Sequence, residues 1–406
     1  MRLFYFTQSY PFGIGEQWKA NELNVLVNEF EEIVVVPFSY AGNFNDPKRL
    51  PEGVRLTDPL FEKEVSLASP SDLVRILFHR RSFSFLKEFF SKKVYRKKAH
   101  IISWITATRR AIDILGHPII REIIKNGSKK DILYFYWGKG GCEFLPFIDT
   151  GVFFKTFVRM HRYDLFEYAN NGYIPYRKAL LKATSITAPS SMAGKQHLDQ
   201  LYPQYASKIQ VIRCGTLSEG QFSRPSTDGV LRVVSCSFLS PVKQVHLIIE
   251  ALQLVEFPIQ WVHIGDGILR AELEKLVDDL GVRDKIQFKG LMDSRKVLDF
   301  YGENNFDLFV NVSSSEGVPF SIMEAFSVGI PVMATRVGGT GEIVDDETGK
   351  ILPPDIGAKD LADALRSFYK TPDEEKQKKR DEALNRYKKF WDSEKLTKEL
   401  SVLLKK

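Results

Sequence analysis

Residues 306–331 read FDLFVNVSSSEGVPFSIMEAFSVGIP, and this stretch decides the fold of the C-terminal half of the chain. Its first residues, 306–310, form a short apolar run bounded by a polar loop, which predicts a buried strand. Pro319 suits the first turn of a helix, and the apolar side chains within residues 322–326 give that helix a buried face. Gly329 then ends the helix. A strand, a short loop and a helix in this order are the repeating unit of an α/β fold.

Two glutamates in this stretch predict a ligand site. Open α/β sheets bind ligands beyond the carboxyl ends of their strands, where the free amides and the dipole of a helix N-terminus favour a diphosphate. Glu316 lies in the loop, and Glu324 lies about two turns further on, within the helix. Carboxylates suit the vicinal hydroxyls of a sugar or a ribose, which present paired donors. Taken singly, either glutamate could be a solvated residue. The hypothesis of a ligand site therefore depends on the whole strand–loop–helix sequence around them.

Apolar runs alternate with amphipathic segments along the rest of the chain, which predicts parallel sheets. Several runs are continuously apolar, as expected for strands that are buried on both faces. The expected strands are residues 3–6, 33–37, 132–136, 154–159, 186–188, 210–214, 231–235, 259–264, 286–289, 306–311 and 332–335. A polar stretch with Gly, Ser and Pro, residues 218–229, predicts a linker. We therefore expect Rossmann-like domains over residues 1–217 and 230–387, and a helix over about 388–406 that could pack back on the first domain.

The overall composition sets broad limits on function. A chain of 406 residues with a 44% hydrophobic content is long enough for two globular domains. Its net charge of +6 fits an anionic small ligand, a membrane surface or nucleic acid, and does not choose among them. The cysteines are not closely paired, which favours a reducing compartment over a disulfide framework or a zinc site. We find neither a signal peptide nor a run of ~20 apolar residues, so we expect a cytoplasmic protein, or one held peripherally at the inner face of the membrane.

The segment 306–344 resembles the signature of glycosyltransferase family 4, whose Glu-x7-Glu motif stands here as EGVPFSIME. The downstream ATRVGGTGEIV resembles the family's two-glycine turn, which is followed by a glutamate beside the donor. The resemblance implies the GT-B fold, in which the parallel sheets of two Rossmann-like domains face a central cleft. It also implies retaining, metal-independent transfer from a nucleotide-diphosphate sugar, with UDP- or GDP-hexose as the expected donor. The resemblance is to the bacterial exopolysaccharide and O-antigen biosynthesis type within this family, a branch that shares the apolar residue at position 238 and keeps the lysine at 243.

The resemblance implies roles for residues of the C-terminal half. Glu316 would orient the transferred sugar, Glu324 would hold the ribose, and Lys243 would stabilise the departing nucleoside diphosphate. The sequence HIGDG at 263–267 resembles the family's strand–glycine–helix turn near the base or ribose, although such a turn alone is generic. The residues that the resemblance places at the donor in this half are Gly265, Gly267, Gly317, Val318, Pro319, Phe320, Ser321, Glu324, Gly338, Gly339 and Glu342.

Two segments of the N-terminal half extend the resemblance. Residues 10–16, YPFGIGE, resemble a flexible glycine loop that approaches the donor phosphates, and the plain alternative is a turn. The residues taken from this loop are Gly13, Gly15 and Glu16. The sequence VRMHRYD resembles the family's His-x-x-Asp element, which implies that His161 faces the reacting centre; a lone histidine is otherwise a packing residue. The implied route is front-side attack through an oxocarbenium-like state. A donor phosphate oxygen takes the acceptor proton, and no metal ion or other cofactor is expected.

One position departs from the family pattern. Members usually carry an arginine and a lysine five residues apart after the first strand of the C-terminal domain; here Lys243 matches, but Phe238 occupies the arginine position. Phenylalanine supplies neither charge nor a bidentate fork, and losing a preorganised cation costs on the order of a few kcal/mol of transition-state stabilisation. Candidate substitutes are Arg159, Arg162 and the helix N-terminus at 319–321. Phe238 keeps open a catalytically impaired GT-B protein that acts as a binding partner or regulator.

Other classes remain open at this stage. An epimerase or a phosphorylase could share the fold, although we find neither the acid/base set of the first nor the pyridoxal-bearing lysine site of the second. The acceptor, a glycan or a polyprenyl-linked glycan, is expected on the N-terminal domain. Residues 80–110 interleave basic and aromatic side chains and could rest on anionic lipid headgroups near such an acceptor. An ordinary helical face with snorkelling lysines is the alternative, and no module typical of nucleic-acid binding is found.

Overall fold

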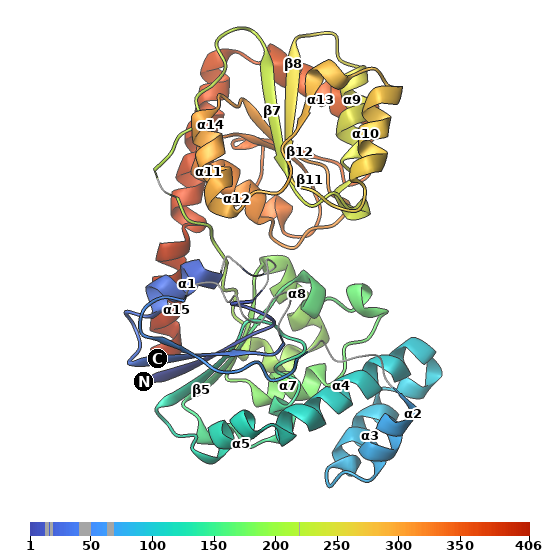
Figure 1. Cartoon of the computed structure of the whole chain (residues 1–406), viewed down its shortest axis with the longest axis vertical. Helices are drawn as coiled ribbons and strands as arrows, with labels where there is room; N and C mark the ends of the chain where they lie inside the picture. The colour runs from blue at the N-terminus through green and yellow to red at the C-terminus, as the bar shows by residue number, and fades with distance from the viewer. Residues whose placement is uncertain (13–15, 17–18, 40–49, 63–68, 219) are drawn as a thin grey trace. The chain divides into compact units, whose positions relative to one another are not determined.

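The computed structural model describes residues 1–12, 16, 19–39, 50–62, 69–218 and 220–406. The chain divides into two compact units, which are described separately (Figure 1). The first comprises Met1–Ile212 with Thr397–Lys406, and the second comprises Arg213–Leu396. The expected linker, 218–229, is tied to the second unit because Asp307 accepts hydrogen bonds from the backbone and hydroxyl of Ser226 at 2.8 and 2.7 Å. Within the described part of the chain, no helix combines the length and apolar character needed to cross a bilayer.

The sheet of the first unit is parallel and six-stranded, in the order β3-β2-β1-β4-β5-β6. Its strands are β1 (Arg2–Thr7), β2 (Glu32–Pro37), β3 (Val54–Leu56), β4 (Asp131–Phe135), β5 (Lys155–Met160) and β6 (Ile186–Pro189). The edge strand β3 was not expected, because three residues are too few to show a period. The segment 210–214 is extended chain rather than a strand, since only the amides of Gln210 and Ile212 bond to β6, at 3.0 and 3.1 Å.

Helices cover both faces of this sheet (Figure 1). Side chains of α5, α7, α8 and the end of α4 pack against one face, around Phe6 and Phe135. Those of α1 and α15 pack against the other, around Tyr5 and Tyr134. Helices α2 and α3 and much of α4 enclose a separate cluster around Phe85 and Trp104. The bounds are α1 (Lys19–Leu26), α2 (Pro70–Leu77), α3 (Ser82–Ser91), α4 (Lys98–Gly116), α5 (Pro118–Lys125), α6 (Arg162–Leu165), α7 (Arg177–Ala183), α8 (Met192–Leu201) and α15 (Ser393–Lys405).

The second sheet is also parallel and six-stranded, in the order β12-β11-β10-β7-β8-β9. Its strands are β7 (Leu231–Cys236), β8 (Ile259–Ile264), β9 (Ile286–Phe288), β10 (Leu308–Asn311), β11 (Val332–Thr335) and β12 (Gly349–Leu352). Successive residues of β10 alternate between two cores: Leu308 and Val310 lie in one, and Phe309 lies in the other. This period of two explains why residues 308–310 are all apolar, since both faces of the strand are buried.

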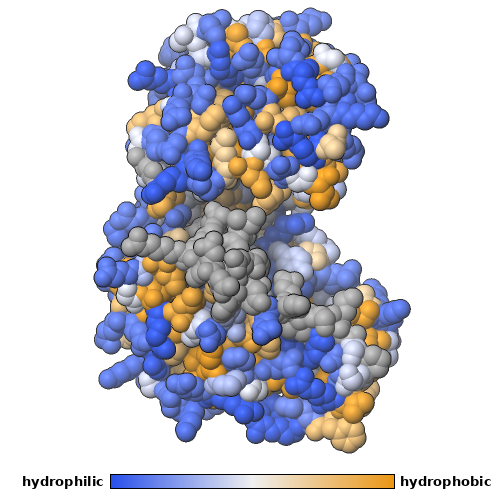
Figure 2. Space-filling model, viewed as in Figure 1, coloured by the Kyte–Doolittle hydropathy of each residue, from blue (hydrophilic) through white to orange (hydrophobic). Residues whose placement is uncertain are grey.

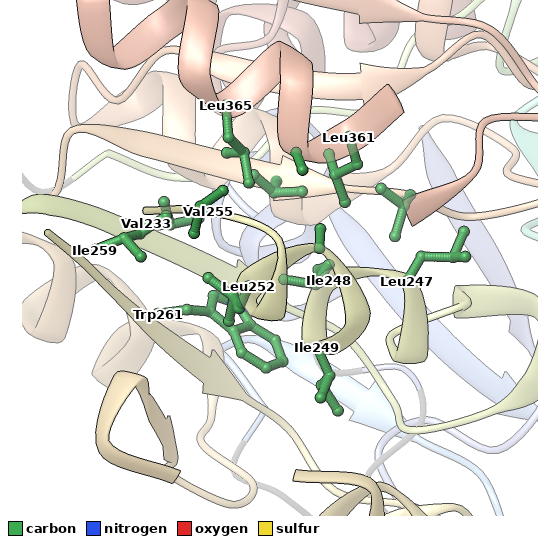
Figure 3. Close-up of a cluster of buried hydrophobic side chains, with 14 of the residues drawn as sticks. Val233, Leu247, Ile248, Ile249, Leu252, Val255, Ile259, Trp261, Leu361 and Leu365 are labelled. Atoms are coloured by element: carbon green, nitrogen blue, oxygen red, sulfur yellow. The ribbon is translucent and has the colours of Figure 1, made fainter. Parts of the chain in front are cut away.

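The two cores of the second unit differ in the helices that cover them. One contains α9, α10 and α13. Figure 3 shows side chains of α9 and α13 beside Val233, Ile259 and Trp261 of the strands. The other contains α11, α12 and α14. The bounds are α9 (His246–Gln253), α10 (Arg270–Asp279), α11 (Ser294–Glu303), α12 (Phe320–Ser327), α13 (Ala358–Lys370) and α14 (Asp373–Phe390). Each fully buried aliphatic or aromatic side chain contributes roughly 1.5–3 kcal/mol of transfer free energy, so these cores hold the strand ends in fixed positions.

Candidate active site

The strand order of the second sheet reverses between β7 and β10, and the loops that follow these two neighbouring strands flank a switch point. Lys243 ends a short 3-10 helix, η6 (Pro241–Lys243), in the loop after β7. Glu316 lies in the loop after β10. The structure brings the two together, because Lys243 Nζ donates to Glu316 Oε1 at 2.6 Å. The sequence named both residues but gave no sign that they form an ion pair.

The Glu316 carboxylate is held on one oxygen. Besides Lys243, the Ser313 hydroxyl donates to Oε1 at 2.6 Å and the Asn311 amide donates at 3.3 Å. The hydroxyl of Thr335 on β11 donates to the Ser313 carbonyl at 2.6 Å, which anchors the loop. Among the described residues no donor reaches Oε2. The carboxylate is therefore fixed in orientation, with one oxygen available to accept hydrogen bonds from a ligand.

The glycines of this region allow loops to lie directly against each other. Gly338 has φ +53°, and a Cβ there would stand 1.9 Å from the Glu316 carbonyl oxygen. Gly339 donates its amide to the Gly317 carbonyl at 2.6 Å, and a Cβ there would stand 2.5 Å from that oxygen. The two-glycine turn after β11 is thus required for packing against the Glu316 loop. Contact of Gly338 and Gly339 with a donor stays a prediction.

A similar contact joins the loops that follow the neighbouring pair of strands, β7 and β8. Gly265 has φ +139°, and a Cβ there would stand 1.9 Å from the carbonyl oxygen of Ser237. At Gly267 a Cβ would stand 2.5 Å from the carbonyl oxygen of Leu239. These glycines therefore let the loop after β8 pack against the loop that carries Phe238. The Phe238 side chain is 63% exposed, so it is not part of the core.

Helix α12 begins just after the loop of Glu316. Pro319 occupies its N-cap position, one residue earlier than the first turn that we expected. Gly317 and Val318 precede this cap, and Phe320 and Ser321 form the first helical residues. The backbone amides of this segment lie at the carboxyl end of β10, as the sequence indicates.

Glu324 lies within α12 and is buried. The hydroxyl of Ser294, at the start of α11, donates to its carboxylate. Burial raises the pKa of Glu324 to about 7, although the Ser294 hydrogen bond opposes the shift. The carboxylate therefore exchanges its proton near neutral pH. Glu342, which ends the 3-10 helix η8 (Thr340–Glu342), is half-buried and lies 3.7 Å from the guanidinium of Arg213.

The raised pKa of Glu324 predicts a pH dependence of donor affinity. If the ionised carboxylate accepts the ribose hydroxyls, lowering the pH from 8 to 6 weakens nucleotide binding by about tenfold, because protonation competes with the ligand. Calorimetric titration of UDP between these pH values measures the effect, and Glu324→Gln should give a flat profile. The same shift lowers stability as the pH rises from 4.5 to 7, because the native state holds this proton more tightly than the unfolded chain. A wild-type affinity that does not change with pH would contradict the ribose role.

His161 lies in the first unit, directly after β5. Its backbone amide donates to Asp164, which also accepts the amide of Gly138. The imidazole stacks on Tyr136 with centroids 5.2 Å apart and lies 4.8 Å from the ring of Trp137. Burial, with the charges of Arg159 and Lys19, holds the pKa of His161 well below its usual value, so the ring is neutral at pH 7. Among the described residues, no group hydrogen-bonds its Nε2.

The expected glycine loop is described only in part. Gly13 and Gly15 lie outside the described residues. The buried carboxylate of Glu16 accepts the backbone amides of Ser9 and Tyr10 at 2.7 Å each and pairs with Lys19. The indole Nε1 of Trp137 donates to it as well. Glu16 therefore shapes the loop after β1, and this structure gives it a positioning role.

The two arginines beside His161 differ in environment. Arg159 is almost fully buried, forms an ion pair with Glu22 of α1 at 2.7 Å, and lies over the rings of Tyr134 and Tyr136. Its charge is engaged within the first unit. Arg162 opens the short helix α6 and is half-buried. A phosphate-binding role for either arginine stays a prediction.

A cavity of about 400 Å³ lies next to this histidine region. Its walls include Glu16, Trp137, Lys139, Tyr163 and Asp164. The ammonium group of Lys139 lies 4.9 Å from the centre of the Tyr163 ring and donates to Asn170 at 2.6 Å. Aromatic faces beside carboxylate, amine and amide groups are suited to a carbohydrate ligand. The sequence analysis missed Trp137 and Lys139, whose only signal is their position just after β4.

Comparison with known proteins assigns part of the chain to a family. Residues 221–388 match the family described as Glycosyl transferases group 1, so the chain contains a group 1 glycosyltransferase domain. WcaL of Escherichia coli, named as a colanic acid biosynthesis glycosyltransferase, is 26% identical over 254 residues, which are 59% of this chain and 62% of that protein. The amylovoran biosynthesis glycosyltransferase AmsK of Erwinia amylovora is 27% identical over 170 residues, 39% of this chain and 42% of that protein. The chain thus matches less than two thirds of the length of these relatives.

Solved structures extend the comparison to the whole chain. The lipopolysaccharide outer core galactosyltransferase WaaB superposes with a TM-score of 0.69 at 14% identity, over all of both chains. HepE of Anabaena, in complex with UDP, superposes with a TM-score of 0.64 at 16% identity, again over all of both chains. At such identities the likeness shows the fold alone. The fold is therefore that of the GT-B glycosyltransferases, as predicted.

Proposed function

We propose that this protein is a retaining glycosyltransferase of the family 4 type, which moves a sugar from a nucleotide-diphosphate donor to a growing glycan or a lipid-linked acceptor in cell-surface polysaccharide synthesis. The observation that carries the proposal is the Lys243–Glu316 pair at the switch point of a group 1 glycosyltransferase domain. The names of the relatives support the polysaccharide context. The UDP bound in HepE makes a uridine nucleotide the first donor to test.

The chemistry follows from the placement of charges. Lys243 would neutralise the diphosphate as it departs, sharing its ammonium group between phosphate and Glu316. The dipole of α12, whose N-terminus lies here, would add partial positive charge. Oε2 of Glu316 would accept a sugar hydroxyl, and Glu324 would accept the ribose hydroxyls. Neutral His161 would donate to or accept from the transferred sugar, and a donor phosphate oxygen would take the acceptor proton.

The acceptor would bind the first unit, in the cavity beside His161. Its aromatic and charged walls support a glycan ligand. The exposed basic and aromatic side chains within residues 80–110, among them Arg80, Phe83 and Phe90, support peripheral contact with an anionic membrane at its cytoplasmic face. The chemistry we assign routes no step through a metal ion, so we propose that transfer is independent of divalent cations.

A panel of nucleotide sugars with purified protein and EDTA tests the function. We expect one donor to raise the melting temperature and release its nucleotide upon addition of acceptor. Glu324→Ala should abolish the shift, and Glu316→Ala should abolish the release. Binding without release by any donor or acceptor would favour the impaired, partner-type protein that Phe238 suggests. The absence of binding to every donor and nucleotide would overturn the transferase function.

Replacing Phe238 with arginine should strengthen the binding of UDP. The side chain is 63% exposed, so Phe238→Arg should change the unfolding free energy by no more than about 0.5 kcal/mol. An added cation near a diphosphate should tighten binding by about tenfold at low salt, and the gain should shrink as salt rises. Phe222→Arg, at another exposed phenylalanine of the same unit, is the matched control. Equal affinities in the two variants would mean that the diphosphate does not reach position 238.

A further inference from the structure

Helix α2 of the first unit turns an apolar face outward. Leu73, Val74 and Leu77 of this helix are exposed, and so is Phe78 directly after it. They share one side of the helix because residues four positions apart, 73 with 77 and 74 with 78, lie on the same face. Phe78 is 87% exposed, and Phe83 at the start of α3 is 82% exposed. Figure 2 shows orange surface at the lower right, over this α2–α3 end of the unit. Contiguous exposed apolar groups of this kind mark interaction sites.

A basic cavity adjoins this apolar face. It has a volume of about 640 Å³ and an apolar wall formed by Ile112, Leu115 and Ile124 of α4 and α5. Its remaining walls are dominated by cationic and imidazole side chains, from α2 and the following turn and from α5. They are Arg75, His79, Arg80, Arg81, Arg121 and Lys125. The cavity therefore combines positive charge at its rim with apolar surface inside.

The charges of this cavity are only partly balanced within the protein. Arg75 forms an ion pair with Asp113 at 2.6 Å, and Arg81 donates to the Phe147 carbonyl at 3.1 Å. Among the described residues, no acidic side chain pairs with Arg80, Arg121 or Lys125. Burial lowers the pKa of His79, and the charges of the neighbouring arginines lower it further. The site is therefore complementary to an anion.

We propose that this surface docks the protein on an anionic bilayer, with the phosphate of a phospholipid headgroup in the basic cavity and the side chains of Leu77, Phe78 and Phe83 among the acyl chains. The proposal deepens the peripheral membrane contact proposed above, on which it rests. A free phosphate or a nucleic acid would use the cations but would leave the phenylalanines exposed. An apolar protein partner would cover the phenylalanines but would leave the cations unmatched. An anionic lipid surface satisfies both at once.

Co-sedimentation of the full chain with vesicles tests the proposal. Phosphatidylcholine vesicles are compared with vesicles that contain about one third phosphatidylglycerol, and we expect binding to the second only. The triple variant Arg80→Ala, Arg121→Ala, Lys125→Ala should weaken this binding by about a hundredfold, given the contribution of each basic residue near an anionic surface. The double variant Phe78→Ser, Phe83→Ser should weaken it by tenfold or more. All five side chains are exposed, so the melting temperature should not change.

Matched controls test whether vesicle binding depends on this surface in particular or on the total number of cations and exposed phenylalanines. Lys378→Ala, Lys388→Ala, Lys389→Ala removes three exposed cations of α14, and Phe222→Ser removes an exposed phenylalanine of the second unit. Both should leave vesicle binding within twofold of wild type. Donor hydrolysis in vesicle-free buffer should be unchanged in every variant, so a failure of membrane docking remains distinct from a failure of the transferase function.

Several outcomes would overturn the proposal. These are absence of vesicle binding, equal binding to neutral and anionic vesicles, and unchanged binding in the triple or double variant. Stabilisation by inorganic phosphate without vesicle binding would assign the cavity to a soluble anion. Loss of self-association in the phenylalanine variant, seen by size-exclusion chromatography in the absence of vesicle binding, would assign the face to a protein contact.

Discussion

Lys243→Ala lowers kcat for glycosyl transfer by about 10²- to 10³-fold, which is the loss expected when one preorganised charge is removed from a developing anion. The physical reason is local, because the ammonium group of Lys243 stands 2.6 Å from Glu316 at the switch point of the second sheet. Phe238 lies in the same loop and supplies no charge. The measurement is single-turnover transfer with the donor that the panel identifies.

Controls for this experiment use the same residue types elsewhere. Lys378→Ala removes an exposed lysine of α14 and should leave kcat unchanged. Glu316→Gln keeps the shape of the partner and should reduce kcat while retaining nucleotide binding, since we assign the ribose and diphosphate contacts to other groups. A Lys243→Ala protein that binds UDP and transfers sugar at the wild-type rate would remove Lys243 from the mechanism.

Arg159→Met lowers the stability of the first unit by about 3–5 kcal/mol, the cost of leaving a buried ion unpaired. The partner left behind is Glu22, which also accepts the hydroxyls of Tyr5 and Tyr134 at 3.0 and 2.7 Å. Hydrogen exchange of the amides of β4 and β5 measures the effect locally. Protection there should fall by about two to three orders of magnitude, at roughly 1.4 kcal/mol per tenfold.

Two further variants define what Arg159 does. Arg159→Met combined with Glu22→Gln removes both charges, and it should recover more than half of the lost stability because no uncompensated ion remains. Arg283→Met, which breaks the exposed pair with Asp278, should cost no more than about 1 kcal/mol. If Arg159→Met instead left protection intact and abolished turnover, the arginine would belong at the donor phosphates.

The sequence predicts much of the fold where loop, proline and glycine residues mark the ends of a segment that also has a clear hydrophobic period. The strand, loop and helix around Glu316 were predicted because an apolar run is followed by a serine-rich loop, a proline and a terminating glycine. The edge strands β3 and β12 were missed, since each is short and only partly buried and shows no clear alternation. The register that aligns β7 with β10 depends on pairing between distant residues, which a single sequence does not display.

The sequence predicted which residues form the site but not the hydrogen bonds and ion pairs among them. Glu316, Glu324 and Lys243 were identified from their motif, whereas the hydroxyls of Ser313 and Ser294 that orient the two glutamates were not. Lys243 and Glu316 are separated by 73 positions and Ser294 and Glu324 by 30, so only the folded sheet brings each pair together.

The sequence contains a signal for the buried position of Arg159 that our sequence analysis did not use, namely the alternation of residues along β5. Along β5, Val158 and Met160 lie in one core, while Phe157 lies in the other, on the side of α1. Strand alternation therefore places Arg159 on the side of Phe157, among buried aromatic rings, where only a carboxylate partner can stabilise it. Glu22 is that partner.

The return of the last ten residues to the first unit sets an order on biosynthesis. Thr397–Lys406 belong to that unit, Leu400 and Leu404 lie in its core, and Lys155 donates to the Leu403 carbonyl at 2.6 Å. At roughly 5–20 residues per second, a ribosome needs about 10–40 s to synthesise the intervening Arg213–Leu396. During that interval α15 does not yet cover the apolar side of β1 and β4 in the nascent first unit. Chaperones bind exposed apolar surface of this kind. The second unit, which is continuous in sequence, is free to finish folding before the first one closes.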